Sequence, residues 1–278
     1  MNRLLINGRP ATQIDFSDRG LHYGDGLFET IALREGRLQF WQAHLQRMLQ
    51  GCQRLGLPPI DAQQWLDDIR TLDVTDDAVI KLMLTRGSGG RGYRAPDRVQ
   101  CTRAVAVYER PGHIEARQAA GIKLRICRTP VSSNSQLAGI KHLNRLDSVL
   151  ARNEWRDEQI AEGLMCDDLG HVIEGTMSNV FMVQNRMLYT PILKKSGIEG
   201  IIRNRVIELA KQLGLVVQQI AMDRKRLMTM DEIFVTNSII GIWPVIDIEG
   251  QHFKRGEVTE LMLQHLDMDL GAVNVQTD

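Results

Sequence analysis

The sequence predicts a mixed α and β protein of two domains, and three observations support this. The chain has 278 residues, more than most single domains contain. Helix-like and strand-like segments alternate along it. A polar stretch over residues 110–120, with Pro-Gly at its start, separates the two halves. We therefore expect a smaller N-terminal α/β domain over residues 1–115 and a larger C-terminal domain over residues 121–278.

In the N-terminal half, the sequence predicts two helices, four strands and a glycine-rich loop. Apolar residues at helical spacing predict an amphipathic helix from Trp41 to Leu55, ended by Gly56, and a second helix follows over residues 62–72. A glycine-rich loop, Arg86–Tyr93, joins two of the predicted strands. Short apolar runs bounded by turn residues predict strands at 4–6, 26–33, 78–85 and 102–108.

The C-terminal half begins with a strand over residues 121–128. Two helices are predicted, over residues 143–155 and 200–213. Paired apolar runs predict hairpins through Asp168-Leu169-Gly170 and through Asn185-Arg186. The remaining strands are expected at 215–220 and 232–235, and the second of these opens into a loop at Thr236-Asn237-Ser238.

Composition excludes several classes of function. Thirty-four basic side chains balance thirty-four acidic ones, so no overall positive field favours nucleic acid or an anionic membrane. No stretch is long enough to span a bilayer, and the apolar run at the start is too short for a signal peptide. The four cysteines are scattered, which favours reduced thiols in a cytoplasm over a disulfide framework. The seven histidines form no ligand cluster, so no metal is expected.

One lysine differs from the others in its surroundings. Lys141 lies in a mostly apolar segment of small residues, 137–143, just before a predicted helix, whereas Lys81 and Lys123 alternate with apolar neighbours and are expected to face water. A lysine in apolar surroundings has a lowered pKa and can form a Schiff base. Taken alone, the segment favours the simpler alternative of a lysine whose ammonium group reaches solvent.

Other residues could bind a cofactor or substrate, and each has a structural alternative. Glu174 ends an apolar strand, where it could hold a pyridine nitrogen or pair with an arginine. The helix that begins after Gly200, the Asn237-Ser238 loop and Arg47 could bind a phosphate. The glycine-rich loop lacks the Walker A sequence, and it is either a plain mobile loop or one that brings Arg91 and Tyr93 to a carboxylate.

Together these segments resemble the fold-type IV family of pyridoxal-phosphate enzymes, which includes branched-chain aminotransferases, D-amino-acid aminotransferases and aminodeoxychorismate lyases. The resemblance covers nearly the whole chain. Its motifs are 23–30 (YGDGLFET), 44–47 (HLQR), Ile140-Lys141, 174–181 (EGTMSNVF), 200–203 (GIIR) and 231–244. The versions at 85–93 (TRGSGGRGY) and 137–146 (LAGIKHLNRL) are most similar to those of the lyases, and Thr30 stands where branched-chain aminotransferases carry glycine.

The resemblance implies a two-domain fold-type IV structure like that of D-amino-acid aminotransferase, with pyridoxal 5′-phosphate bound by the C-terminal domain. It implies that Lys141 carries the cofactor and then acts as the base, and that Thr30 protonates the leaving enolpyruvyl group. The remaining implied cofactor ligands are Glu174, at the ring nitrogen, and Arg47, Asn179, Ile201, Ile202, Asn237 and Ser238. His22, Arg91 and Tyr93 are the implied substrate contacts. Trp243 departs from the small residue that aminotransferases often have there, so it could reshape the pocket.

The expected reaction is the conversion of 4-amino-4-deoxychorismate to 4-aminobenzoate and pyruvate, a step of folate biosynthesis, by a cytoplasmic homodimer. Two alternatives remain open. A transaminase acting on D-amino or branched-chain amino acids would use the same lysine and glutamate. A catalytically silent ligand-binding or scaffold protein would not need them, yet both are present.

Overall fold

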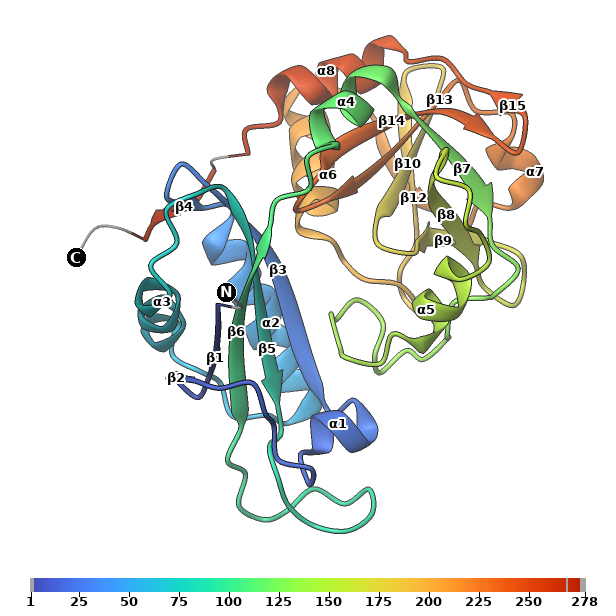
Figure 1. Cartoon of the computed structure of the whole chain (residues 1–278). Helices are drawn as coiled ribbons and strands as arrows, with labels where there is room; N and C mark the ends of the chain where they lie inside the picture. The colour runs from blue at the N-terminus through green and yellow to red at the C-terminus, as the bar shows by residue number, and fades with distance from the viewer. Residues whose placement is uncertain (1–2, 269, 276–278) are drawn as a thin grey trace. The chain divides into compact units, whose positions relative to one another are not determined.

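The computed structural model describes residues 3–268 and 270–275, and these form two compact units. Unit 1 comprises the described residues of Met1–Arg110, Ile140–Asn144 and Met268–Asp278, and unit 2 comprises Pro111–Gly139 and Arg145–Asp267. Each unit contains one sheet with helices packed on it (Figure 1). The short segment Ile140–Asn144 therefore belongs to unit 1, although both of its neighbours in the sequence belong to unit 2.

Unit 1 is built on a seven-stranded antiparallel sheet with the order β16-β4-β3-β5-β6-β1-β2. Its longest strands, β3, β5 and β6, pair along most of their length. The strand bounds are β1 Leu4–Ile6, β2 Arg9–Pro10, β3 Gly26–Arg34, β4 Arg37–Leu38, β5 Ala78–Thr85, β6 Thr102–Glu109 and β16 Val273–Asn274.

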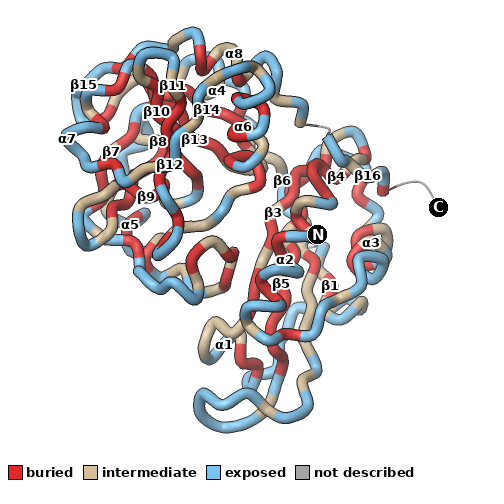
Figure 2. Tube along the Cα trace, turned by 180° about the vertical axis from the view of Figure 1, so that it is seen from behind, coloured by how far each residue is buried: buried red, intermediate tan, exposed pale blue. Residues whose placement is uncertain are grey.

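Helix α2, Trp41–Leu55, covers one face of this sheet, and α1, Arg19–Tyr23, and α3, Ala62–Thr71, complete the unit (Figure 1). The helix approaches β3 closely because Gly51 has no side chain: a Cβ there would lie 2.7 Å from a methyl carbon of Leu27. Gly56 ends the helix in the left-handed conformation, with φ of 62°. The buried residues of β3 and β5 therefore form a core under α2, as the red segments of Figure 2 show.

Unit 2 contains a nine-stranded mixed sheet with the order β12-β11-β10-β13-β14-β7-β8-β9, and β15 pairs with β14. The pairs β11–β12, β14–β7 and β7–β8 are parallel, and the others are antiparallel. The strand bounds are β7 Ile122–Ile126, β8 Ile160–Cys166, β9 Val172–Gly175, β10 Asn179–Gln184, β11 Met187–Pro191, β12 Val217–Ile220, β13 Glu232–Asn237, β14 Gly241–Ile248 and β15 Gln251–His252.

The helices of unit 2 pack on this sheet. Helix α6, Ile201–Gln212, contacts β12 and β13, and α8, Glu257–His265, contacts α6, β13 and β14. The others are α4, Ile114–Ala120, on β14, α5, Leu146–Arg152, on β8, and α7, Arg224–Leu227. At the centre of the sheet the rings of Phe181 and Phe234 stack with centroids 5.0 Å apart, and neither is exposed.

The predicted mixed α and β class and two-domain fold are confirmed, and α2 has the predicted bounds. The helix predicted over residues 143–155 is shorter, Leu146–Arg152, and residues 140–144 instead belong to unit 1, where His142 forms a bridge with Leu27 of β3. The sequence patterns gave no prediction for α1, α4, α8 or β14. Within the residues that the structure describes, no helix combines the length and apolar character that crossing a membrane requires.

Candidate active site

Lys141 lies on a short stretch that pairs with the edge of β3. The backbone N–H of Phe28 donates to the carbonyl of Lys141 at 3.0 Å, and the N–H of Leu143 donates to the carbonyl of Gly26 at 3.0 Å. An antiparallel bridge joins Leu27 and His142. Because side chains of directly opposed residues share one face of a sheet, this register places Lys141 on the same face as Phe28.

Two lysines flank the ring of Phe28. Lys141 Nζ lies 4.3 Å from the ring centroid and Lys81 Nζ lies 5.4 Å from it. Thr30 is two residues beyond Phe28 on the same strand face, and it pairs with Lys81 of the neighbouring strand β5. The ring thus holds both ammonium groups by cation–π attraction. Lys81, which the sequence predicts to face water, is half-buried and stands directly opposite Thr30, the candidate acid.

On the opposite face of β3, a buried carboxylate joins two basic residues of α2. Arg47 Nε donates to Glu29 Oε1 at 2.8 Å and Arg47 Nη2 donates to Glu29 Oε2 at 2.5 Å. His44 Nδ1 lies 2.6 Å from Glu29 Oε2. Arg47, the expected phosphate ligand, is therefore held in a bidentate ion pair.

Burial and charge act against each other in this network. Burial raises the pKa of Glu29, but the charges and hydrogen bonds of Arg47 and His44 more than offset it and hold that pKa at about 2. Burial lowers the pKa of His44, against the attraction of Glu29, so the ring is neutral near pH 7. The neutral ring donates from Nδ1, and its buried Nε2 has no hydrogen-bond partner.

In unit 2, Glu174 lies near the end of β9 and is buried. Its Oε2 accepts a hydrogen bond from the backbone N–H of Ile198 at 2.8 Å. The loop can come this close because Gly197 has a φ of 84° and no side chain: a Cβ there would lie 2.8 Å from Leu193 and 3.3 Å from Glu174 Oε2. The loop that precedes α6 therefore orients the carboxylate.

A second buried carboxylate supports the turn after Glu174. Glu162, only 2% exposed, accepts hydrogen bonds from the backbone and hydroxyl of Thr176, at 3.0 and 2.5 Å. It also accepts from the backbone of Met177 at 3.1 Å and from Ser178 Oγ at 2.9 Å. The sequence gave no signal for this role, because Glu162 lies in an apolar strand twelve residues before the acid that it supports.

Two features of unit 2 suit a phosphate group. Helix α6 begins after Gly200 with no side chain capping its first N–H groups, which are those of Ile201 and Ile202. At the end of β13, Thr236 Oγ1 is buried and has no hydrogen-bond partner. Asn179 shapes the first feature, since its Nδ2 donates to Ile198 O at 2.8 Å.

The Asn237-Ser238 loop is held by the asparagine side chain. Asn237 Oδ1 accepts from the backbone N–H groups of Ile239 and Ile240, at 2.9 and 3.0 Å, and Nδ2 donates to Met177 O at 3.1 Å. Asn237 thus links this loop to the turn that Glu162 supports. The half-buried Ser238 is then the hydroxyl of the loop available for a ligand.

Three residues, His22, Arg91 and Tyr93, are expected to contact substrate. Two of them, His22 and Tyr93, contact the same ring, that of Tyr23. The ring of Tyr23 contacts both His22 and Tyr93 edge-on, with centroid distances of 5.7 and 5.5 Å. His22 also lies 2.7 Å from the carbonyl of Phe16. Tyr93 is 88% exposed, and Arg91 is exposed on the same loop.

Trp243 is a core residue of unit 2. Its indole N–H donates to the carbonyl of Ile114 at 3.1 Å, and Arg117 lies 5.3 Å from the ring centroid. It therefore packs α4 onto β14 within the main hydrophobic cluster.

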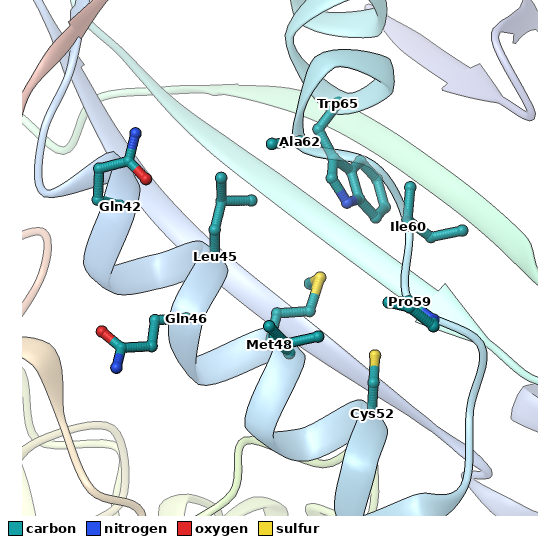
Figure 3. A pocket seen from close by; sticks show the side chains of 10 residues that line it. Gln42, Leu45, Gln46, Met48, Cys52, Pro59, Ile60, Ala62 and Trp65 are labelled. Atoms are coloured by element: carbon teal, nitrogen blue, oxygen red, sulfur yellow. The ribbon is translucent and has the colours of Figure 1, made fainter.

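An apolar cavity of about 480 Å³ lies elsewhere in unit 1. Leu45 and Met48 of α2 face Ile60 and Trp65 across it (Figure 3). None of the candidate catalytic or cofactor residues lines it, so it is not the candidate active site. Within residues 3–268 and 270–275, no cluster of three or more metal-ligating side chains occurs.

Comparisons with known proteins show the family and the fold of this chain. Residues 26–248 match the family described as amino-transferase class IV. An aminodeoxychorismate lyase from Vibrio harveyi is 35% identical over 90% of this chain and 92% of its own length. The crystal structure of 4-amino-4-deoxychorismate lyase from Pseudomonas aeruginosa superposes with a TM-score of 0.91 at 39% identity, over 96% of this chain and 99% of that one. A D-alanine aminotransferase from Bacillus licheniformis is 27% identical over 91% of both.

The buried His44–Glu29 pair predicts a loss of stability in acid. In the unfolded chain His44 takes up a proton near its ordinary pKa of 6.5, but the folded state holds that pKa lower, so stability falls as the pH drops below about 6.5. Glu29 adds a further loss between about pH 4.5 and 2. Urea unfolding of His44→Asn should show about 1–2 kcal/mol less stability at pH 7 and a flatter profile from pH 7 to 5.

His252→Asn is the matched control, because His252 is exposed and also pairs with an aspartate. It should keep the wild-type profile. A wild-type profile for His44→Asn would contradict the role of the buried ring.

Proposed function

Because the chain belongs to the amino-transferase class IV family, we propose that it is a pyridoxal 5′-phosphate-dependent lyase that converts 4-amino-4-deoxychorismate to 4-aminobenzoate and pyruvate. The observation that carries the choice of a lyase is the 39% identity to a 4-amino-4-deoxychorismate lyase along 96% of the chain. The D-alanine aminotransferase compared above is 27% identical. We also propose a cytoplasmic location, which the four free thiols support.

Each unit, taken by itself, has residues whose chemistry suits the cofactor. In unit 1, Lys141 Nζ is the amine that would hold it covalently. In unit 2, Glu174 is a buried carboxylate for the ring nitrogen, and the start of α6 with the Ser238 loop offers donors for the phosphate. When bound, the cofactor supplies an aldehyde that takes up the substrate amine and a ring that accepts the electron pair left by the broken C–H bond.

Arg47 would bind a phosphate while it stays paired with Glu29. Because Glu29 already accepts from Nε and Nη2, the guanidinium would meet a phosphate as the outer member of a Glu29–Arg47 pair. The carboxylate fixes the plane of the guanidinium, which lowers the entropy cost of binding an anion.

The chain's own side chains would then move two protons. Lys141 Nζ, once released, removes the proton from the carbon that bears nitrogen, and Thr30 Oγ1 gives a proton to the departing enolpyruvyl carbon. Both groups lie on the Phe28 face of β3. Lys81 lies beside them and can bind a substrate carboxylate there, which would orient the leaving group over Thr30.

Supplying 4-amino-4-deoxychorismate to the purified enzyme should yield 4-aminobenzoate and pyruvate in equal amounts. A transaminase would instead convert its bound cofactor to the pyridoxamine form with alanine or glutamate and would release no pyruvate from aminodeoxychorismate. That second outcome, measured from the cofactor's absorbance, would replace the lyase proposal with the aminotransferase alternative.

Two substitutions on the Phe28 face should have different effects. Lys141→Ala should abolish turnover and remove the cofactor that borohydride otherwise fixes on Lys141, because the variant lacks the amine that would hold the cofactor and act as the base. Thr30→Ala should lower kcat by roughly 10²-fold or more while the cofactor stays bound, since general acid catalysis contributes about that much. Wild-type turnover in Lys141→Ala would refute the assignment, and cofactor loss as the main defect of Thr30→Ala would make Thr30 structural.

We further propose that the enzyme is a homodimer. Helix α5 exposes Leu146, Val149 and Leu150 by 76%, 50% and 60%, and this spacing puts them on one helix face. Sedimentation should give a dimer at micromolar concentration, and Leu146→Glu with Leu150→Glu should weaken it. Leu169→Glu, at an exposed turn residue, is the control. A monomeric wild-type protein would disprove the proposal.

A further inference from the structure

We propose that Arg19 is a positioning residue that fixes the glycine-rich loop over residues 86–94 and thereby sets the affinity for the carboxylate end of the substrate. The inference rests on the proposed function, in which Arg91 and Tyr93 of this loop contact substrate. Arg19 itself would touch no substrate. Its effect would pass through the backbone of the loop.

The guanidinium of Arg19 is directed to the backbone of the loop. Its Nη1 donates to the carbonyl of Gly92 at 3.0 Å and more weakly to that of Arg94 at 3.4 Å, and its Nη2 donates to the carbonyl of Tyr93 at 3.0 Å. Arg19 is only 3% exposed. A buried cation that meets three successive carbonyls holds that stretch of backbone in one conformation, because each carbonyl replaces a water in its solvation.

Arg19 is fixed in turn by groups outside the loop. Its Nε pairs with Asp25 Oδ2 at 3.0 Å, and its guanidinium carbon lies 4.8 Å from the centroid of Tyr23. Tyr23 also contacts the ring of Tyr93. Arg19 is therefore connected to the loop in two ways. It donates hydrogen bonds to the loop backbone, and the ring of Tyr23 contacts both Arg19 and Tyr93.

Asp25 connects this anchor to α2. Arg86, at the start of the loop, donates to both oxygens of Asp25, at 2.8 and 3.1 Å. Arg86 also donates to the carbonyls of Leu55 and Gly56 at the end of α2, at 2.7 and 2.9 Å. Burial raises the pKa of Asp25, but the hydrogen bonds from the two arginines outweigh it and keep the carboxyl ionised.

The base of the loop is closed by a neighbouring carboxylate. Asp18, which is fully buried, accepts from Thr85 Oγ1 at 2.9 Å and from Thr102 Oγ1 at 2.7 Å, so it joins the strands on either side of the loop. The backbone N–H of Arg19 donates to the carbonyl of Gly87 at 2.9 Å. The loop is thus held at its base and along residues 92–94, which leaves the exposed side chains of Arg91 and Tyr93 on an ordered backbone.

Preorganisation gives the anchor its effect on binding. A loop that is already ordered loses less conformational entropy when its side chains bind a ligand. Loss of the anchor should therefore raise KM more than it lowers kcat, because the loop carries neither the base nor the proton donor. A residue needed only for folding would change the amount of active enzyme and leave KM unaltered.

The test uses the holoenzyme with Arg19→Gln and the milder Arg19→Lys, which keeps the charge but cannot reach all three carbonyls and Asp25. We expect KM for aminodeoxychorismate to rise about tenfold in Arg19→Gln, with kcat within about threefold of wild type. Trypsin should cleave after Arg91, Arg94 or Arg98 at least several-fold faster. Arg186→Gln is the matched control, because Arg186 forms an exposed ion pair with Glu257 in unit 2.

The outcomes are separable from those of the proposed function. If the wild-type enzyme releases no pyruvate from aminodeoxychorismate, the proposed function fails, while the trypsin comparison still tests the anchor. Faster cleavage with an unchanged KM overturns the inference, because the ordered loop would then not serve substrate binding. Unchanged cleavage in both Arg19 variants overturns it as well, and Arg19→Lys decides the matter if Arg19→Gln does not fold.

Discussion

The pairing of residues 140–143 with the free edge of β3 is the interaction on which the candidate site depends. Two backbone hydrogen bonds, Phe28 to Lys141 and Leu143 to Gly26, fix the register. Because side chains alternate along a strand, a shift of one residue would send Lys141 to the opposite face, away from Phe28 and Thr30. Gly26 permits the close approach, since a Cβ there would lie 2.8 Å from a methyl carbon of Leu143. A lysine at position 141 lies beside Phe28 and Thr30 only in this register.

Three carboxylates organise the parts of the candidate site, Glu29 and Glu162 buried and Asp25 half-buried, and each is satisfied by different donors. Glu29 is paired with a guanidinium and a neutral imidazole, Asp25 with two guanidinium groups, and Glu162 with backbone N–H groups and hydroxyls. A buried carboxylate is unfavourable unless such partners surround it, so each of them holds its partners firmly in place. None of the three would touch substrate. Their function is to fix Arg47, the 86–94 loop and the turn that follows Glu174.

Sequence patterns predicted the elements whose formation depends on residues close together in the chain. Helix α2 was predicted correctly because its apolar spacing and Gly56 act within the helix itself. The helix expected from residue 143 begins at Leu146 because residues 140–144 gain strand pairing with a segment more than a hundred residues away, which no periodicity reports. Strand β14 was missed because Pro244 interrupts its apolar run, and proline argues against a central strand. In the structure β14 is central, with Pro244 opposite Phe234 of β13.

The same limit applies to the site. Lys141 and Glu174 could be proposed from motifs, because each lies in a characteristic segment. The contacts that orient them could not, since Lys141 meets Phe28 only when residues 140–143 pair with β3, and Ile198 meets Glu174 only when the loop before α6 folds over β9. Sequence analysis therefore finds the candidate reactive groups and misses the contacts that position them.

The arrangement also explains how one fold can serve both lyases and transaminases. The lysine, the acidic residue and the phosphate donors are supported by strand pairing and buried carboxylates, which depend little on the substrate. The groups that would distinguish substrates are Thr30 and Lys81 on the open face of β3 and β5, and Arg91 and Tyr93 on the anchored loop. Exchanging Thr30, Lys81 or Arg91 leaves the carboxylate pairs beneath them intact. In this chain, the side chains expected to meet substrate are thus separate from the buried charges below them.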